Sequence, residues 1–304
     1  ERITITNNKT RVKCGDKIER NGEFIKDVFP ENRQYKLKVG YIVERHLLNG
    51  DYVLMGRQPS LHKGSFMGME VVVKPHRTFR VNLGVTKPLN LDFDGDELNI
   101  HLAQSPTALV ELKYLASAEN NIISVQSSKP VVSIVQDALV GSYRMTRGFV
   151  PISRSLFFDI GMLIPKRPKS DETLTSSDIL KRIEFIKKIF EEKGVKESVF
   201  CGKGIFSLFL PRNLVYERKN NANKDEPIVK IYKGVLYAGT LDKNILGSVH
   251  NSLLQILYKE YSPSDSVYFI DCVHFTVNTW LKHSGFSISL GDCIISDEYK
   301  KQDI

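Results

Sequence analysis

The sequence predicts an α+β protein with a β-rich first part and a mainly helical second part. Short apolar runs rich in β-branched residues, bounded by Gly, Pro or Asn, occupy much of residues 36–83. From residue 105 onward, apolar residues recur at helical spacing. The chain has 304 residues, 41% of them hydrophobic, so we expect two domains, each with a substantial core.

The first part is expected to form a compact β unit. Asn21 and Gly22 give a two-residue hairpin signal within the polar residues 1–35. Further strands are predicted in four runs, at residues 36–47, 52–55, 68–73 and 78–83. Together these strands could close into a barrel, with an acidic loop leaving its last strand.

The second part is expected to combine helices with a few strands. A helix is predicted to begin at Ser105, a good N-cap, with Pro106 in its first turn, and the second domain begins with it. Further helices are predicted at residues 135–146, 155–164, 178–193, 251–261 and 267–283, the last ended by Gly285. Strands are predicted at residues 205–210, 228–231 and 235–238, with a polar loop at 213–226.

The most specific chemical feature is an acidic run in which four carboxylates lie within six residues. Like charges packed so closely favour a bound cation. In an extended backbone Asp92, Asp94 and Asp96 would share one face, while Phe93 would turn toward a core and Gly95 would permit a tight bend. Oxygen ligands favour a hard ion, Mg²⁺ or Ca²⁺.

Calcium can be tested against the EF-hand loop. That loop requires Gly directly after the third acidic position and Glu at position twelve, where this sequence has Glu97 and Ala103. Mg²⁺ fits better, because it retains water and takes further ligands from substrate phosphates. An acidic surface turn without a metal remains an alternative. The four cysteines include no C-x-x-C pair, so no zinc site is predicted.

The charge of the chain is consistent with a nucleic-acid partner. The formal net charge is +8, although four of the acidic residues are concentrated at 92–97, so a basic surface around an acidic pocket is expected. No stretch approaches the ~18 apolar residues of a membrane span, and no signal peptide opens the chain. We therefore expect a soluble intracellular protein, and we interpret the chain as a segment of a longer polypeptide.

Residues 90–98, NLDFDGDEL, closely resemble the NADFDGDEM signature of the largest subunit of multisubunit DNA-directed RNA polymerases. Other similar segments follow in the family's order. They are RQPSLHK at 57–63, KP at 129–130 with VQD at 135–137, and GFSISLGD at 285–292. The resemblance covers nearly the whole chain and is most marked for eukaryotic and large-DNA-virus forms.

The resemblance implies a domain organisation and a site. It implies a double-psi-like β-barrel in an active-site domain over residues 1–105, a mixed α+β pore domain over 106–290, and the start of a funnel segment at 291–304. It also implies a two-metal mechanism in which this chain holds one Mg²⁺ and another arrives with the nucleotide. The metal ligands would be Asp92, Asp94 and Asp96.

Two further residues take roles from the resemblance. Arg57 and Asn90 would contact the ribose of the incoming nucleotide or of the RNA 3′ end. The sequence departs from the family pattern at three places without losing a carboxylate: Gly56 replaces Asn, Leu91 replaces Ala and Leu98 replaces Met. The loss of a polar side chain at Gly56 puts one supporting contact in doubt.

The activity implied is the template-directed transfer of a nucleoside triphosphate to an RNA 3′ end. Its partners would be the second-largest polymerase subunit, other subunits, DNA template, RNA transcript and nucleoside triphosphates, in a nucleus, a host cytoplasm or a virion. Because the second-largest subunit supplies further residues, the chain alone is expected to bind Mg²⁺ weakly and to be inactive. The alternatives are a Mg²⁺-dependent nuclease or phosphoesterase and a structural metal site in a nucleic-acid-binding scaffold.

Overall fold

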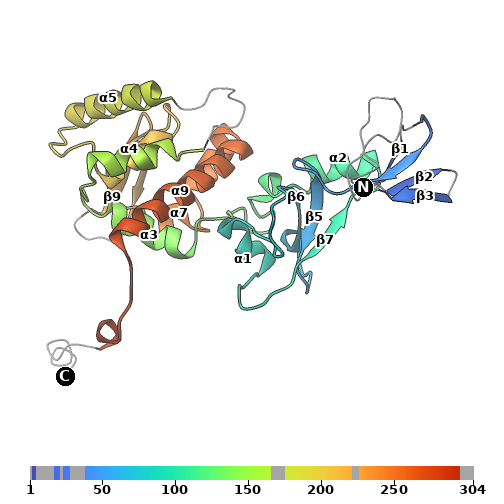
Figure 1. Cartoon of the computed structure of the whole chain (residues 1–304). Coiled ribbons are helices and arrows are strands. Elements are labelled where there is room, and N and C mark those ends of the chain that lie inside the picture. The colour runs from blue at the N-terminus through green and yellow to red at the C-terminus, as the bar shows by residue number, and fades with distance from the viewer. Residues whose placement is uncertain are drawn as a thin grey trace. The chain divides into compact units, whose positions relative to one another are not determined.

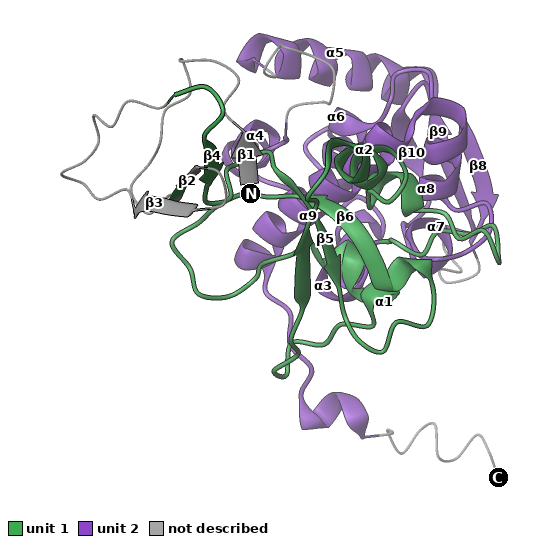
Figure 2. Cartoon of the chain, turned by 90° about the vertical axis from the view of Figure 1, so that its right-hand side faces the viewer, with its two compact units in different colours: residues 1–133 green, residues 134–304 purple. Residues whose placement is uncertain are grey.

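The protein contains two compact units, residues 1–133 and 134–304, which Figure 2 colours separately. The computed structural model describes residues 2–4, 17–20, 23–27, 38–165, 175–220 and 226–294. Helices and antiparallel sheets occur together (Figure 1), which confirms the predicted α+β class. The predicted domain boundary after residue 105, which stays a prediction, differs from the division between these units.

The first sheet of the first unit has the strand order β1-β4-β2-β3 and is antiparallel. Its strands are Arg2–Thr4 (β1), Lys17–Arg20 (β2), Glu23–Asp27 (β3) and Ile42–Glu44 (β4). Arg20 pairs with Glu23, so β2 and β3 form the predicted hairpin. The turn residues themselves, 21 and 22, lie outside the described residues.

The second sheet has the order β6-β5-β7 and carries the segments that matter for function. Its strands are Tyr52–Gly56 (β5), Phe66–Glu70 (β6) and Asn99–Leu102 (β7). Val53 and Met55 of β5 are buried, as expected for alternating residues of a strand with one core-facing side. Neither sheet of this unit closes on itself among the described residues, so the double-psi-like barrel is not confirmed.

The helix Pro106–Tyr114 (α2) packs on β5 and β6. It begins as predicted, because the Ser105 hydroxyl accepts a hydrogen bond from the Ala108 N–H at 3.2 Å. Gly68 of β6 permits the close approach, since a Cβ there would lie 2.5 Å from the carbonyl oxygen of Leu112. The helix belongs to the first compact unit.

The strand predicted at residues 78–83 is wrong. A short 3₁₀ helix, Leu83–Val85, occupies the end of this run and leads into α1 (Thr86–Leu89). The Asn82 side chain accepts a hydrogen bond from the Gly84 N–H at 2.8 Å, and this local bond competes with strand pairing.

The second unit is built around the long helix Pro263–Ser284 (α9). Helices Gln136–Thr146 (α3), Arg154–Met162 (α4), Gly202–Phe209 (α6) and Leu253–Ile256 (α8) contact α9. α9 begins four residues earlier than predicted, because the Ser262 hydroxyl caps it by accepting a hydrogen bond from the Asp265 N–H at 3.1 Å. It ends at Gly285, as predicted.

The remaining elements of this unit agree with the predictions from the sequence in most places. They are Ser176–Glu192 (α5), Lys243–Leu246 (α7), a π-helical turn Leu257–Tyr261 that follows α8, and the antiparallel strands Tyr216–Lys219 (β8), Ile228–Tyr232 (β9) and Val235–Ala238 (β10). The prediction missed β8, whose residues were assigned to a polar loop. No described helix combines the length and apolar character that crossing a bilayer demands.

The strand predicted at residues 205–210 is wrong, because this run forms α6. All eight residues of α6 are buried, although its apolar residues recur at helical spacing and not at every second position. Gly202 and Gly204 allow this burial, since a Cβ at either would collide with the carbonyl oxygen of Met145 or of Val199. The helical spacing of Ile205, Phe206, Leu208 and Phe209 is the signal that distinguishes this run from a strand.

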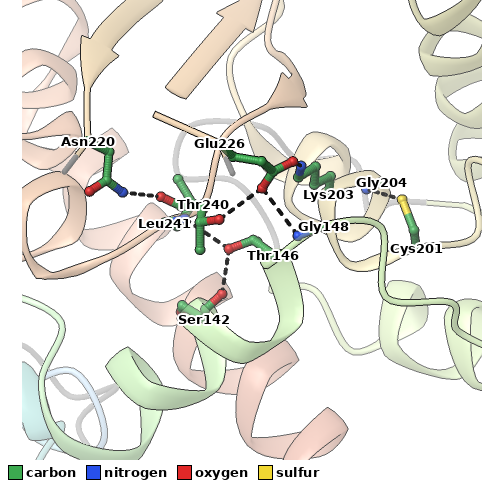
Figure 3. A network of polar contacts seen from close by, with 10 residues as sticks. All are labelled: Ser142, Thr146, Gly148, Cys201, Lys203, Gly204, Asn220, Glu226, Thr240 and Leu241. Carbon is green, nitrogen blue, oxygen red and sulfur yellow. Dashed lines mark hydrogen bonds and ion pairs between the residues drawn. The ribbon is translucent and has the colours of Figure 1, made fainter. Parts of the chain in front are cut away.

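A buried ion pair joins α6 to the segment that precedes β9 (Figure 3). Lys203 is fully buried, and its Nζ lies 2.5 Å from Glu226 Oε1 and 4.3 Å from the centre of the Phe149 ring. The other carboxylate oxygen of Glu226 accepts hydrogen bonds from the Gly148 N–H at 3.2 Å and the Thr240 hydroxyl at 2.9 Å. One carboxylate therefore links four separate segments of this unit.

Candidate metal centre

The acidic run lies in the connection from α1 to β7. It therefore precedes the last strand of its sheet, rather than leaving that strand as predicted. Asn90 ends α1 in the left-handed conformation with φ of 48°, and its N–H donates to the Lys87 carbonyl at 3.1 Å. A turn follows at residues 93–95, where Gly95 has φ of 121°. Only a glycine adopts that angle readily, so the bend is fixed by the sequence.

Asp96 is the most enclosed of the three predicted ligands and is held by Arg57. Arg57 Nη2 donates to Asp96 Oδ1 at 2.9 Å, and Arg57 Nε lies 2.7 Å from Asp96 Oδ2. The Asp92 N–H also donates to Asp96 Oδ2, at 2.8 Å. The side-chain bond from Arg57, followed by the backbone bond from Asp92, lowers the pKa of Asp96, and the same side-chain bond raises the pKa of Arg57.

Asp92 and Asp94 are both exposed. Asp92 Oδ1 accepts a hydrogen bond from the neighbouring Phe93 N–H at 2.8 Å. Phe93 is 61% exposed, so the expectation that it turns into a core is wrong. The turn at 93–95 explains the difference, because alternation of side chains between two faces requires an extended backbone.

The three carboxylates are not gathered around one point in this structure. Across the described ranges, no group of three or more His, Cys, Asp or Glu side chains is arranged to hold a metal ion. The donor chemistry nevertheless fits a hard divalent cation, since the run offers only carboxylate oxygens and two of its aspartates face solvent. The residue types therefore fit Mg²⁺. In this structure, however, the Asp96 carboxylate is bound by the guanidinium of Arg57.

Strand pairing brings Arg57 to Asp96 although 39 residues separate them in sequence. β5 and β7 pair antiparallel with Gly56 opposite Asn99, so the residue after β5 lies near the segment that enters β7. The Arg57 N–H also donates to the Ser65 carbonyl at 3.3 Å. The sequence predicts separate roles for Arg57 and Asp96 but not their contact, because the register of β5 and β7 cannot be read from residue types alone.

Asn90 is exposed and lies directly before Leu91. It is the C-cap of α1, which fixes its backbone conformation. The described contacts bring Arg57 to Asp96 but show no contact between Arg57 and Asn90. The two residues expected to share a ribose therefore come from different parts of the unit, the end of β5 and the end of α1.

The departure at Gly56 has a structural reason. A Cβ at this position would overlap the ring of Phe66, which pairs with Gly56 across β5 and β6. Phe66 thus occupies the space in which the family's Asn would begin. Any side chain at position 56 would therefore collide with this ring unless Phe66 moved.

The same unit also contains a basic loop. Residues 72–80 are all exposed, and they include Lys74, Arg77 and Arg80. Exposed cations without a fixed geometry suit a phosphate backbone, which is recognised mainly by charge.

Comparison with known proteins identifies the family. The family described as "RNA polymerase Rpb1, domain 2" matches residues 2–118, and "RNA polymerase Rpb1, domain 3" matches residues 121–293. The chain is 38% identical over 302 residues to the "Probable DNA-directed RNA polymerase II subunit RPB1 homolog" of Invertebrate iridescent virus 6, covering 98% of this chain and 29% of that protein.

An archaeal protein is also similar. The "DNA-directed RNA polymerase subunit Rpo1N" of Thermococcus celer is 33% identical over 289 residues, covering 84% of this chain and 30% of that protein. The chain thus spans less than a third of the length of either relative. Since the two domain families together match nearly all of its residues in order, the chain belongs to the family of the largest subunits of DNA-directed RNA polymerases.

Proposed function

We propose that this chain forms the catalytic centre of the largest subunit of a DNA-dependent RNA polymerase. The reaction would be templated transfer of a nucleoside triphosphate to an RNA 3′ end. The observation that carries this proposal is the aspartate run on a fixed turn between α1 and β7, inside the region matched by domain 2 of the family. Family membership gives the nuclease and phosphoesterase alternatives no support.

Asp92, Asp94 and Asp96 would hold Mg²⁺ in this enzyme. When bound, the ion supplies positive charge for the phosphates and lowers the pKa of the attacking hydroxyl. The chain's own contribution is to present carboxylate oxygens on a turn fixed by Gly95 and β7. A double-psi-like barrel, of which β6-β5-β7 would be a part, is the proposed rigid support.

Arg57 and Asn90 are proposed to position the ribose. Both side chains carry N–H donors suited to hydroxyl oxygens, and Asn90 is exposed at the end of α1. A site that hydrogen-bonds a hydroxyl discriminates against substrates that lack it. These two residues would therefore favour ribonucleotides over deoxyribonucleotides.

The proposed partners follow from how much of the enzyme lies outside this chain. The relatives are more than three times as long as the matched region, so the complete site would need the rest of the largest subunit, the second-largest subunit and other subunits. DNA template, RNA transcript and nucleoside triphosphates are the proposed ligands. The second unit would line the route by which nucleotides enter, and the enzyme would work in a nucleus, a host cytoplasm or a virion.

The test is a matched pair of charge-removing substitutions in the reconstituted polymerase. Asp94→Asn should lower templated RNA synthesis by about a thousandfold or more while the subunits still assemble. Glu97→Gln removes an exposed carboxylate three residues away and should retain most activity, because Glu97 is not a proposed ligand. Synthesis at the wild-type rate by assembled Asp94→Asn enzyme would overturn the proposal and favour a structural ion site.

A further inference from the structure

The contact between Arg57 and Asp96 points to a role for Arg57 before any metal arrives. We propose that the Arg57 guanidinium is the resident counter-ion of Asp96 in the metal-free chain, and that a divalent cation must displace it to use Asp96 as a ligand. This inference rests on the proposed function. It makes metal loading the event that frees Arg57 for another partner.

The contact between Arg57 and Asp96 is a well-defined, two-point ion pair. Two nitrogens of the guanidinium reach the two oxygens of one carboxylate, at 2.9 Å and 2.7 Å. Such forked pairs hold a fixed geometry. The side chains are only 22% and 15% exposed, whereas Asp92 and Asp94 are exposed. Arg57 directly follows β5 and Asp96 lies three residues before β7, so the pairing of these strands brings the two residues together.

The pair competes directly with metal binding. Three donors occupy the Asp96 carboxylate: Arg57 Nη2 on Oδ1, and Arg57 Nε with the Asp92 N–H on Oδ2. An ionised carboxylate offers about four acceptor positions, so little capacity remains for a cation. A guanidinium at hydrogen-bond distance also repels a second positive charge at the same oxygens.

The sign of a mutational effect separates this role from the obvious alternative. If Arg57 competes with the metal, removal of its charge should tighten metal binding. If Arg57 instead holds Asp96 in a ligating orientation, its removal should weaken metal binding. A structural bond that is irrelevant to the metal predicts no change.

The experiment measures binding of Mn²⁺, a paramagnetic substitute for Mg²⁺, to the 304-residue chain at low ionic strength. Electron paramagnetic resonance of free Mn²⁺ reports occupancy without any activity assay. Arg57→Gln should lower the dissociation constant by roughly tenfold, and Arg57→Lys, which keeps the charge but not the fork, should fall between Arg57→Gln and wild type. Arg80→Gln removes a charge from the exposed loop and should change binding by about twofold or less.

Asp94→Asn distinguishes failure of this inference from failure of the proposed function. If Asp94→Asn abolishes Mn²⁺ binding but Arg57→Gln leaves it unchanged or weaker, the counter-ion role is overturned and the metal site stands. If Asp94→Asn binds Mn²⁺ as wild type does, the metal site itself fails. Binding by Arg57→Gln but not by wild type supports the inference, and binding by neither overturns it. Circular dichroism identifies any variant that has not folded, and Arg57→Lys then decides the outcome.

Discussion

A single buried imidazole makes the stability of the second unit depend on pH. His274 of α9 is 8% exposed, and within the described part of the chain neither ring nitrogen has a hydrogen-bond partner. Burial lowers the pKa of His274 from 6.5 to about 4. The unfolded chain therefore binds a proton at this residue across pH 4 to 6.5 that the folded chain does not.

The expected result is a loss of stability as the pH falls. The free energy of unfolding should decrease by about 2 kcal/mol between pH 7 and pH 5, because the folded pKa lies below the unfolded value. Urea unfolding followed by the fluorescence of Trp280, the only tryptophan of the chain and a residue of the same helix, measures this change.

His274→Leu provides the control, because leucine cannot take up a proton. The variant should lack this part of the pH dependence, whatever its stability at pH 7. If its free energy of unfolding falls between pH 7 and pH 5 by as much as that of wild type, other groups cause the effect and the assignment to His274 is wrong.

Residue types predicted the candidate site, but not the contacts of its side chains. Asp92, Asp94 and Asp96 lie within five residues of one another in the chain, so the sequence alone identifies them as candidate ligands. The exposure of Phe93 and the engagement of Asp96 by Arg57 depend on a turn and on the register of two strands. Neither is determined by the residues of the run alone.

At the scale of elements, breaking the ion pair between α6 and Glu226 should be strongly destabilising, and the cost should depend on which partner is removed. Glu226→Ala would leave the fully buried Lys203 ammonium without a carboxylate, which costs about 3–5 kcal/mol for a broken buried pair. Lys203→Met should cost less. Glu226 would keep its bonds from the Gly148 N–H and the Thr240 hydroxyl, and its side chain is 21% exposed.

Chemical denaturation monitored by Trp280 fluorescence compares the two variants. Glu217→Ala serves as the control, because its carboxylate is 64% exposed and lies 3.6 Å from Lys230 in an exposed pair. Exposed pairs contribute about 1 kcal/mol or less. Equal losses for Glu226→Ala and Lys203→Met would show that the buried ammonium is not the dominant cost.

Helices α5 and α6 show where the prediction of elements from the sequence succeeds and where it fails. α5 was predicted well because Ile179, Ile186 and Phe190 are buried on one face while its lysines and glutamates face solvent. α6 was wrongly predicted as a strand from the short apolar run 205–210, although the apolar residues of this run recur at helical spacing. The missed β8 has the opposite cause, since its residues Glu217, Arg218 and Lys219 are polar and lie at the edge of a three-stranded sheet.

At the scale of the whole molecule, the sequence predicted the α+β class and the order of its parts. It did not determine how strands distant in sequence join into sheets. The sheet β6-β5-β7 joins β7 to β5 across more than forty intervening residues. Such nonlocal pairing is decided by packing, for example by α2 on β5 and β6, rather than by local propensity.

The chain alone is expected to be catalytically inactive. It spans less than a third of its relatives, and in its own structure the three aspartates are not gathered and Asp96 is engaged by Arg57. Charged and oriented groups from the rest of the enzyme would be needed to position a triphosphate and to stabilise its charge, and these two effects account for most of the catalysis in phosphoryl transfer. An assay with purified chain, DNA template, primer RNA, nucleoside triphosphates and Mg²⁺ should therefore yield no templated extension.

The design must separate a weak activity of the chain from a trace of contaminating polymerase. Asp94→Asn chain, purified in the same way, carries the same contaminants but lacks one proposed ligand. Extension at equal rates in the two preparations indicates a contaminant and leaves the prediction intact. Extension by wild-type chain that is absent from the Asp94→Asn preparation would contradict it, because the activity would then depend on this chain's own carboxylate. Such a result would mean that the two units contain enough of the site to align a nucleotide without any other subunit.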